Sequence, residues 1–203
     1  MTNKYKKYLI EMLVWFSVAT ATAFLPLTAT KLNLLGLFLY LIVIVLMIKQ
    51  KIFRKINFKN NFRKYLLPWI IMSSVMIFSL IITKNIFPSG LFKGFCQSYS
   101  CLLWNLPQYV FINSVLQELV FRGYFFEKTK EYFSTNKTII ISSLIFAYFH
   151  LAYLIQLKSE LFYISIIAGI IWGIFYSKYP NMILAMISHP VVKAITLLLL
   201  QKF

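Results

Sequence analysis

LNLLGLFLYLIVIVLMI, residues 32–48, carries no charged side chain and approaches the roughly 20 apolar residues that a helix needs to cross a bilayer. Apolar runs of similar length recur along the chain. We predict a helix for each of them, at residues 8–26, 32–48, 65–83, 106–126, 138–157, 160–177 and 181–201. The sequence therefore predicts an all-α fold, a polytopic transmembrane helical bundle of about seven spans, within a range of six to eight.

The composition supports a membrane location for the whole chain. Hydrophobic residues make up 60% of the 203 residues and charged residues only 13%, whereas an ordinary soluble domain is about 45–50% apolar. A soluble core cannot bury that much apolar surface. We expect residues 1–203 to form a single membrane domain, a multi-pass protein of the cell membrane whose first partner is the lipid bilayer.

The charge balance is strongly basic, with 21 Lys and Arg against 5 acidic residues. In a soluble protein this would suggest nucleic acid, but here we expect no nucleic acid partner, since basic residues collect in cytoplasmic loops of membrane proteins. With the helices above, fourteen basic residues fall on the side of the N-terminus and five on the other. We predict a cytoplasmic N-terminus, a basic cytoplasmic loop at residues 49–64 and an external C-terminus.

Two features remain open at this stage. Cys96 and Cys101 are the only cysteines, and they could form a disulfide or remain two thiols. The segment at residues 86–105 is either an external loop or, in its second half, a re-entrant piece. The sequence does not predict an oligomeric state.

Five ionisable residues fall well inside predicted spans, away from their ends, and a charge there is costly enough to suggest a functional site. At about 1.5 Å per residue, three of them lie at similar depths, roughly 12 to 18 Å from the cytoplasmic edge. We therefore predict one shared polar pocket in the cytoplasmic half of the membrane. The five residues are Glu118, Arg122, His150, His189 and Lys193.

Other interpretations of these residues stay open. Glu118 and Arg122 stand four positions apart on one helix face, so they can form an internal salt bridge that only joins helices. Each histidine could be a packing residue. One Glu and two His could bind zinc, but no H-E-x-x-H motif is present, so we expect no metal and no cofactor.

Three short motifs occur in order along the second half of the chain. They are QELVFRG at residues 117–123, FAYFH at residues 146–150 and HPVVK at residues 189–193. Together they resemble the motifs E-E-x-x-x-R, F-x-x-x-H and H-x-x-x-N/D of the CAAX protease and bacteriocin-processing family, also called the Abi family. The resemblance covers roughly residues 105–200, which we expect to form the helices of the catalytic core.

The resemblance implies an intramembrane endopeptidase of the glutamate type. In such enzymes a glutamate of the first motif and the histidine of the second polarise a water, which attacks the scissile carbonyl. By position, His150 would hold the water, His189 would face the oxyanion and Arg122 would orient Glu118. Two positions depart from the pattern, since Gln117 replaces the first glutamate and Lys193 the final Asn or Asp.

The departures leave several interpretations. Either Glu118 has taken over as the base, or this copy is weakened or inactive, or Gln117 is an introduced change. The first functional hypothesis is an endopeptidase acting on a peptide or a lipidated protein. The second is a noncatalytic relative that serves as a bacteriocin immunity or membrane scaffold protein, and the third is a transporter or channel. The departures also predict slow cleavage or none.

Overall fold

The structure is a computed structural model that describes residues 3–25, 29–58, 61–86, 107, 112–157 and 161–200. Within these ranges the regular structure is entirely helical, with no strand. The predicted all-α fold is therefore confirmed. Cys96, Cys101 and nearly all of the segment predicted as a loop or re-entrant piece lie outside the described residues.

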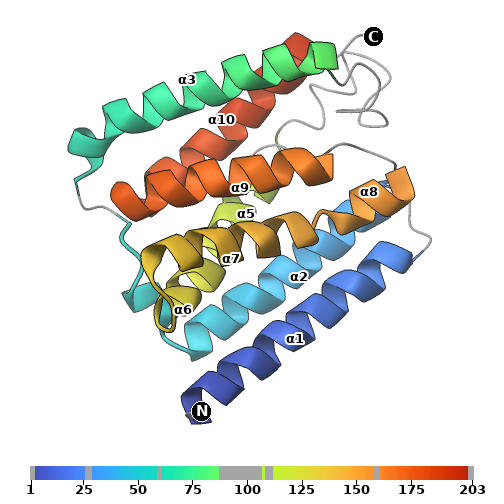
Figure 1. Ribbon diagram of the computed structural model, residues 1–203, viewed down its shortest axis with the longest axis vertical. Coiled ribbons are helices and arrows are strands. Elements are labelled where there is room, and N and C mark those ends of the chain that lie inside the picture. The colour runs from blue at the N-terminus through green and yellow to red at the C-terminus, as the bar shows by residue number, and fades with distance from the viewer. Residues whose placement is uncertain are drawn as a thin grey trace.

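Three long helices form the first half of the chain (Figure 1). They are α1 (Asn3–Phe24), α2 (Ala29–Lys49) and α3 (Phe62–Ile86), and the short 3₁₀ helix η1 (Ile52–Arg54) lies between α2 and α3. Their bounds agree with the predicted helices to within five residues, because long uninterrupted apolar runs leave little choice of secondary structure.

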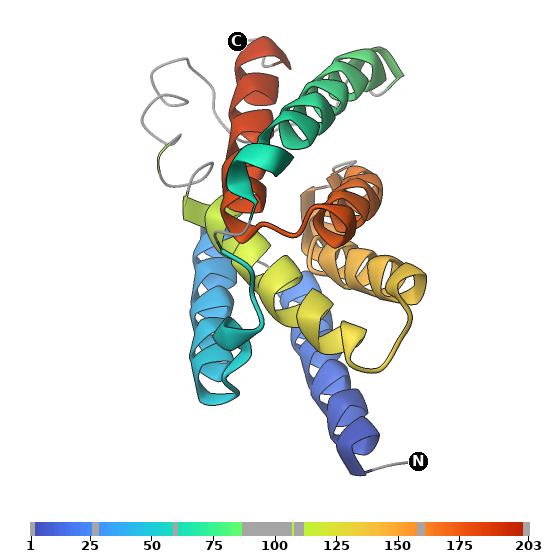
Figure 2. The same cartoon turned by 90° about the vertical axis from the view of Figure 1, so that its left-hand side faces the viewer.

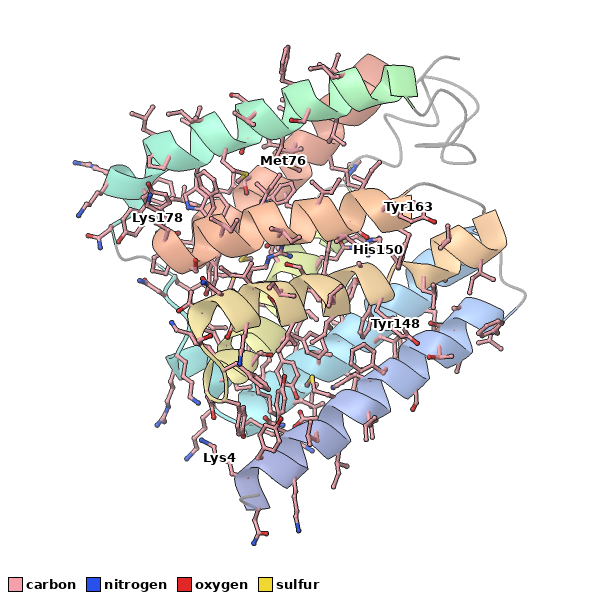
Figure 3. The ribbon with its side chains drawn as sticks, viewed as in Figure 1. Lys4, Met76, Tyr148, His150, Tyr163 and Lys178 are labelled. Carbon is pink, nitrogen blue, oxygen red and sulfur yellow. The ribbon has the colours of Figure 1, made fainter. Side chains whose placement is uncertain are left out.

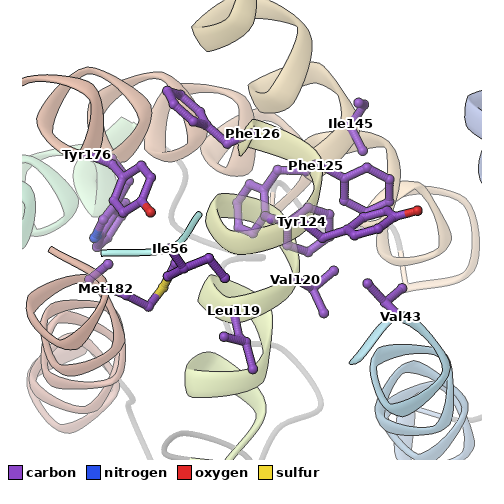
Figure 4. Packing of buried hydrophobic residues seen from close by; sticks show 14 of the residues in the cluster. Val43, Ile56, Leu119, Val120, Tyr124, Phe125, Phe126, Ile145, Tyr176 and Met182 are labelled. Carbon is purple, nitrogen blue, oxygen red and sulfur yellow. The ribbon is translucent and has the colours of Figure 1, made fainter. Parts of the chain in front are cut away.

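The fourth helix consists of three consecutive segments, α5 (Asn113–Glu118), η3 (Leu119–Phe126) and α6 (Glu127–Lys130). It crosses the centre of the bundle, with the other helices arranged around it (Figure 2). Aromatic and aliphatic side chains project from it toward its neighbours, among them Val43 of α2, Ile145 of α7 and Met182 of α10 (Figure 4). Every residue of η3 is buried, so the central helix is also the core of the molecule.

The remaining helices are α7 (Thr135–Tyr148), α8 (Leu151–Leu157), α9 (Leu161–Lys178) and α10 (Met182–Leu200). The predicted continuous helix at residues 138–157 is wrong in one respect, since it is broken between Tyr148 and Leu151. The break brings His150 out of regular helical geometry.

Helices α7 and α9 pack closely through small residues. Gly169 and Gly173 form a G-x-x-x-G pattern on one face of α9, a spacing that allows two helix backbones to approach in a membrane. A Cβ added to Gly169 would come within 3.0 Å of Cα of Ser143. No larger residue fits there without a shift of backbone, so glycine sets the distance between the two helices.

Large apolar side chains cover much of the outside of the bundle. Exposed examples occur on several helices: Leu13 on α1, Phe38 on α2, Leu67 and Phe78 on α3 and Ile167 on α9. Soluble monomers rarely expose so much apolar surface. Two helices, Asn3–Phe24 and Phe62–Ile82, are long and apolar enough to cross a membrane, and shorter apolar helices are Leu34–Lys49, Phe162–Lys178 and Met182–Ile195.

Polar contacts join α1 to segments far along the chain. Tyr8 hydrogen-bonds Thr129 at 3.1 Å between hydroxyl oxygens, and Thr20 hydrogen-bonds Tyr148 at 2.7 Å. Lys128 forms an ion pair with Glu11. The N-terminal helix is therefore held by the fourth helix and α7.

Glu131, just after α6, connects two further parts of the chain. Its carboxylate accepts from Lys4 at 2.9 Å and from Lys55. Partial burial acts to raise the pKa of Glu131, but the hydrogen bonds from Lys55 and Lys4 outweigh it and lower that pKa below its ordinary value. The ionised carboxylate thus ties the start of α1 and the α2–α3 connection to the fourth helix.

Candidate functional site

Glu118, the last residue of α5, is the centre of a buried charged cluster. Its Oε1 lies 2.7 Å from Nδ1 of His189 on α10, and its Oε2 lies 3.3 Å from Nε of Arg122. Glu118 is 0% exposed and Arg122 3%. Because a carboxylate can only accept hydrogen bonds, His189 donates from Nδ1. The carboxylate of Glu118 and the guanidinium of Arg122 thus neutralise each other inside the bundle, and a buried charge needs such a partner.

Arg122 lies in η3, which is a π-helix. Such segments are rare and often occur at functional sites. Its Nη2 donates to the carbonyl of Gly169 at 3.5 Å, and its guanidinium lies over the ring of Phe146, 5.0 Å from the centroid. The close approach of α9, allowed by its glycines, and a cation–π contact from α7 thus hold the arginine in place.

The imidazole of His189 is also held by its surroundings. Its ring lies 5.1 Å from that of Trp172 on α9, measured between centroids. Trp172 in turn donates from Nε1 to Oγ of Ser188 at 3.0 Å. Glu118 on one side and Trp172 on the other leave the ring little freedom to rotate.

His150 lies at the break between α7 and α8 (Figure 3). Its Nδ1 is 2.8 Å from the carbonyl oxygen of Phe146, which in a regular α-helix would accept the backbone N–H of residue 150. That N–H bonds Ala147 instead, at 2.8 Å. The side chain thus competes with the backbone for one acceptor, as other short polar side chains do, and the helix ends there.

The hydrogen bond to Phe146 also decides the chemistry of His150. Since a carbonyl only accepts, Nδ1 carries the proton, and in the neutral imidazole Nε2 then carries the lone pair. The rings of His150 and Phe146 lie 4.7 Å apart, and those of Phe146 and His189 lie 6.2 Å apart. Phe146 therefore stands between the two histidines.

A cavity of ≈ 50 Å³ lies beside His150, among α1, α2 and the fourth helix. Gln117 also lines it, and its Nε2 donates to the hydroxyl of Tyr40 on α2 at 3.0 Å. The lining residues are Thr22, Leu35, Gly36, Leu39, Tyr40, Asn113, Gln117, Phe149, His150 and Ala152. Gln117 and His150 thus line one space, which Glu118 and His189 do not line.

The structure therefore divides the predicted site residues into two groups. Glu118, Arg122 and His189 are in direct contact, and Gln117 and His150 share the cavity. Lys193 follows His189 by one turn of α10 and is partly buried. Within the described residues no three or more His, Cys, Asp or Glu lie together as a metal site would need.

The depth of the pocket in the membrane stays a prediction, but the helix bounds from which it was counted differ in the structure. Thr22, in the last turn of α1, lines the cavity, so the cavity lies away from the end of the bundle that holds the N-terminus. The fourth helix continues to Lys130 and α7 begins at Thr135, which puts Glu118 twelve residues and His150 fifteen from those ends. The helices extend through charged residues at these ends. A prediction from apolar runs leaves such residues out and so places the helix ends too close to the site.

Sequence reasoning missed three residues around the site. Tyr40 reaches Gln117 from 77 positions away, and Trp172 packs on His189 from a helix outside the motifs. Asn113, one turn before Gln117, is the exception in principle, because its spacing places it on the same helix face. A polar residue one helical turn before a motif was the available indication.

The fold and the site together define a helical-bundle protein that encloses a polar site among its helices. Residues 99–195 match the family described as type II CAAX prenyl endopeptidase, Rce1-like, and the matched segment contains all three motifs. This match confirms the resemblance to the CAAX protease and bacteriocin-processing family. That family consists of integral membrane proteins. No curated protein and no solved structure matches the chain.

Proposed function

We propose that this chain is a CAAX-protease-like intramembrane endopeptidase, which cleaves a peptide or a lipidated protein with an activated water. The observation that carries the proposal is the position of His150 on the cavity. A water needs about 10–15 Å³ of such space and polar partners, and the ≈ 50 Å³ cavity offers both at His150 and Gln117.

His150 is the group that takes the proton from this water. Gln117 cannot accept a proton at neutral pH, and Glu118 is engaged by Arg122 and His189. The hydrogen bond from Nδ1 to Phe146 leaves Nε2 as the basic nitrogen of the neutral ring. A lone imidazole in place of a glutamate–histidine pair explains why we expect slow turnover.

The charged cluster stabilises the oxyanion that forms from the scissile carbonyl. Glu118 and Arg122 position the ring of His189, and Lys193, one turn along α10, supplies a cationic N–H donor for the oxyanion that forms when the water attacks. Lys193 occupies the place of the Asn or Asp of the family motif and can donate, as that role requires.

A second candidate function has one observation in its favour. The cavity presents the amide of Gln117 where the family motif has a carboxylate. A protein without a strong base in this position would bind a membrane peptide and not cleave it. This is the noncatalytic relative, a bacteriocin immunity or membrane scaffold protein.

The experiment is a cleavage assay in proteoliposomes with a farnesylated peptide that ends in a CAAX sequence. We expect slow cleavage by the unaltered chain, an increase of about 10²–10⁴-fold for Gln117→Glu, since general-base catalysis contributes factors of that size, and loss of all activity for His150→Ala. Ile140→Ala, at an exposed position of α7, is the matched control.

Two results would change the assignment. Fast cleavage by the unaltered chain, abolished in a Glu118→Gln variant that remains folded, would make Glu118 the base. Binding of the peptide without cleavage, by both the unaltered chain and Gln117→Glu, would favour the noncatalytic function.

A further inference from the structure

The cavity beside Gln117 has a distinctive polar lining. In the described part of the chain it contains no Lys, Arg, Asp or Glu, but five neutral side chains that can hydrogen-bond: Thr22, Tyr40, Asn113, Gln117 and His150. A lipid phosphate or a free carboxylate would call for a cation in the lining. The lining instead suits an uncharged ligand that both donates and accepts hydrogen bonds.

Two carboxamides stand together in this lining. Asn113 and Gln117 are four residues apart on α5, on one face and one turn from each other. Each carboxamide carries both donors and an acceptor, which is also the character of a peptide group with its N–H and C=O. Two carboxamides in a row can therefore pair with an extended peptide backbone.

Asn113 presents a carboxamide to the cavity. The residue is only 8% exposed and lines this space. Leaving a buried amide without a hydrogen bond costs about 1–3 kcal/mol, so a ligand that pairs with the Asn113 carboxamide is favoured.

We propose that Asn113 and Gln117 form a clamp that binds the peptide backbone of the substrate. The inference rests on the proposed function, because it names the groups that hold the substrate of that site. The amide at position 117 can pair with both the N–H and the carbonyl of a peptide group.

Gly36 on α2 gives a way to block this space. A Cβ added at Gly36 meets no atom within 4 Å, although the residue lines the cavity. A side chain added at this position therefore begins in open space and reduces the room left in the cavity.

The test measures binding in phosphatidylcholine nanodiscs at 4 °C, so that cleavage does not interfere. The probes are a fluorescent farnesylated CAAX peptide and a set of analogues in which each peptide group in turn is replaced by an ester, which lacks the N–H. We expect one ester to bind the unaltered chain about 3–10-fold more weakly than the amide, as the net value of one hydrogen bond implies.

The variants identify the partner of that peptide group. In Asn113→Leu, which has a side chain of similar size, the amide peptide should bind about 3–10-fold more weakly and the difference between amide and ester should disappear. Ile112→Leu, at the exposed position just before α5, should bind like the unaltered chain. Gly36→Phe should abolish binding, while Leu41→Phe on the exposed face of α2 should not.

The clamp is refuted if every ester binds the unaltered chain as tightly as the amide, a result that needs no variant to fold. It is also refuted if Asn113→Leu keeps the affinity and the ester difference. Peptide binding with this pattern but without cleavage would overturn the catalytic proposal and leave the clamp. Cleavage by Asn113→Leu with an unchanged KM would refute the clamp and leave the catalytic proposal.

Discussion

Among single residues, Glu118 carries the largest consequence for stability. It is the carboxylate that compensates the buried guanidinium of Arg122, and it also accepts from His189. We expect Glu118→Gln to lower the free energy of unfolding by about 3–5 kcal/mol, because removing one partner leaves an uncompensated charge inside the bundle. Thermal unfolding in detergent micelles measures the change.

The matched control is Glu11→Gln, which removes the partner of Lys128 at the edge of the bundle. Both side chains of that pair are partly exposed, so the loss of stability should be clearly smaller. An equal melting temperature for Glu118→Gln and the unaltered chain would contradict the role of Glu118.

The residues that the sequence identified are those whose partners lie on the same helix or in a known motif. The spacing of Glu118 and Arg122 predicted their ion pair, since positions four apart meet on any helix. The contact between Gln117 and Tyr40 spans 77 positions and depends on how two helices pack. No local pattern contains that information.

Among the elements, the contact between α7 and α9 depends on Gly169. We expect Gly169→Ala to destabilise the protein by about 1–3 kcal/mol, because overpacking at a tight contact costs that much and the added Cβ would lie 3.0 Å from Cα of Ser143. Gly36→Ala is the control, since it has the same gain in helix propensity and open space around it.

Thermal unfolding of both variants under the same conditions isolates the packing term. If Gly169→Ala is as stable as Gly36→Ala, then α7 and α9 separate freely and glycine does not set their distance.

Helix positions were predictable to within a few residues over most of the chain, since hydrophobic runs of bilayer length determine them. The break at His150 was not, because it arises when one imidazole takes the carbonyl of Phe146. The π-helix at Leu119–Phe126 was also missed. Both irregularities fall on the site, where local rules are expected to fail.

For the whole molecule, the basic loop at residues 49–64 predicts the orientation in the membrane. We expect Arg54→Cys, an exposed position in η1, to be labelled by a membrane-impermeant thiol reagent only from the cytoplasmic side, in a chain whose Cys96 and Cys101 are replaced by Ser. Labelling of intact cells from outside would contradict a cytoplasmic N-terminus.

The contacts of Glu131 predict a pH dependence. Because Lys55 and Lys4 hold its pKa below the ordinary value of 4.5, the folded state favours the ionised form. This contribution to stability is complete above pH 4.5 and is lost as the pH falls through the lower, folded-state pKa. Comparing the melting temperatures of the unaltered chain and Glu131→Gln from pH 7 to pH 3 measures it. The difference between the two should shrink at the acid end, and a constant difference would exclude this role for Glu131.

The contacts of α1 with Thr129 and Tyr148 have a consequence for biosynthesis. Each joins residues more than 120 positions apart, so α1 leaves the ribosome long before these partners do. At a synthesis rate of about 5–20 residues per second, α1 waits on the order of ten seconds before α7 emerges. During that interval the carboxyl group of Glu11 has no Lys128 to pair with. A chaperone or the insertion machinery that shields this helix would thus act before any of the helices with the three motifs exist.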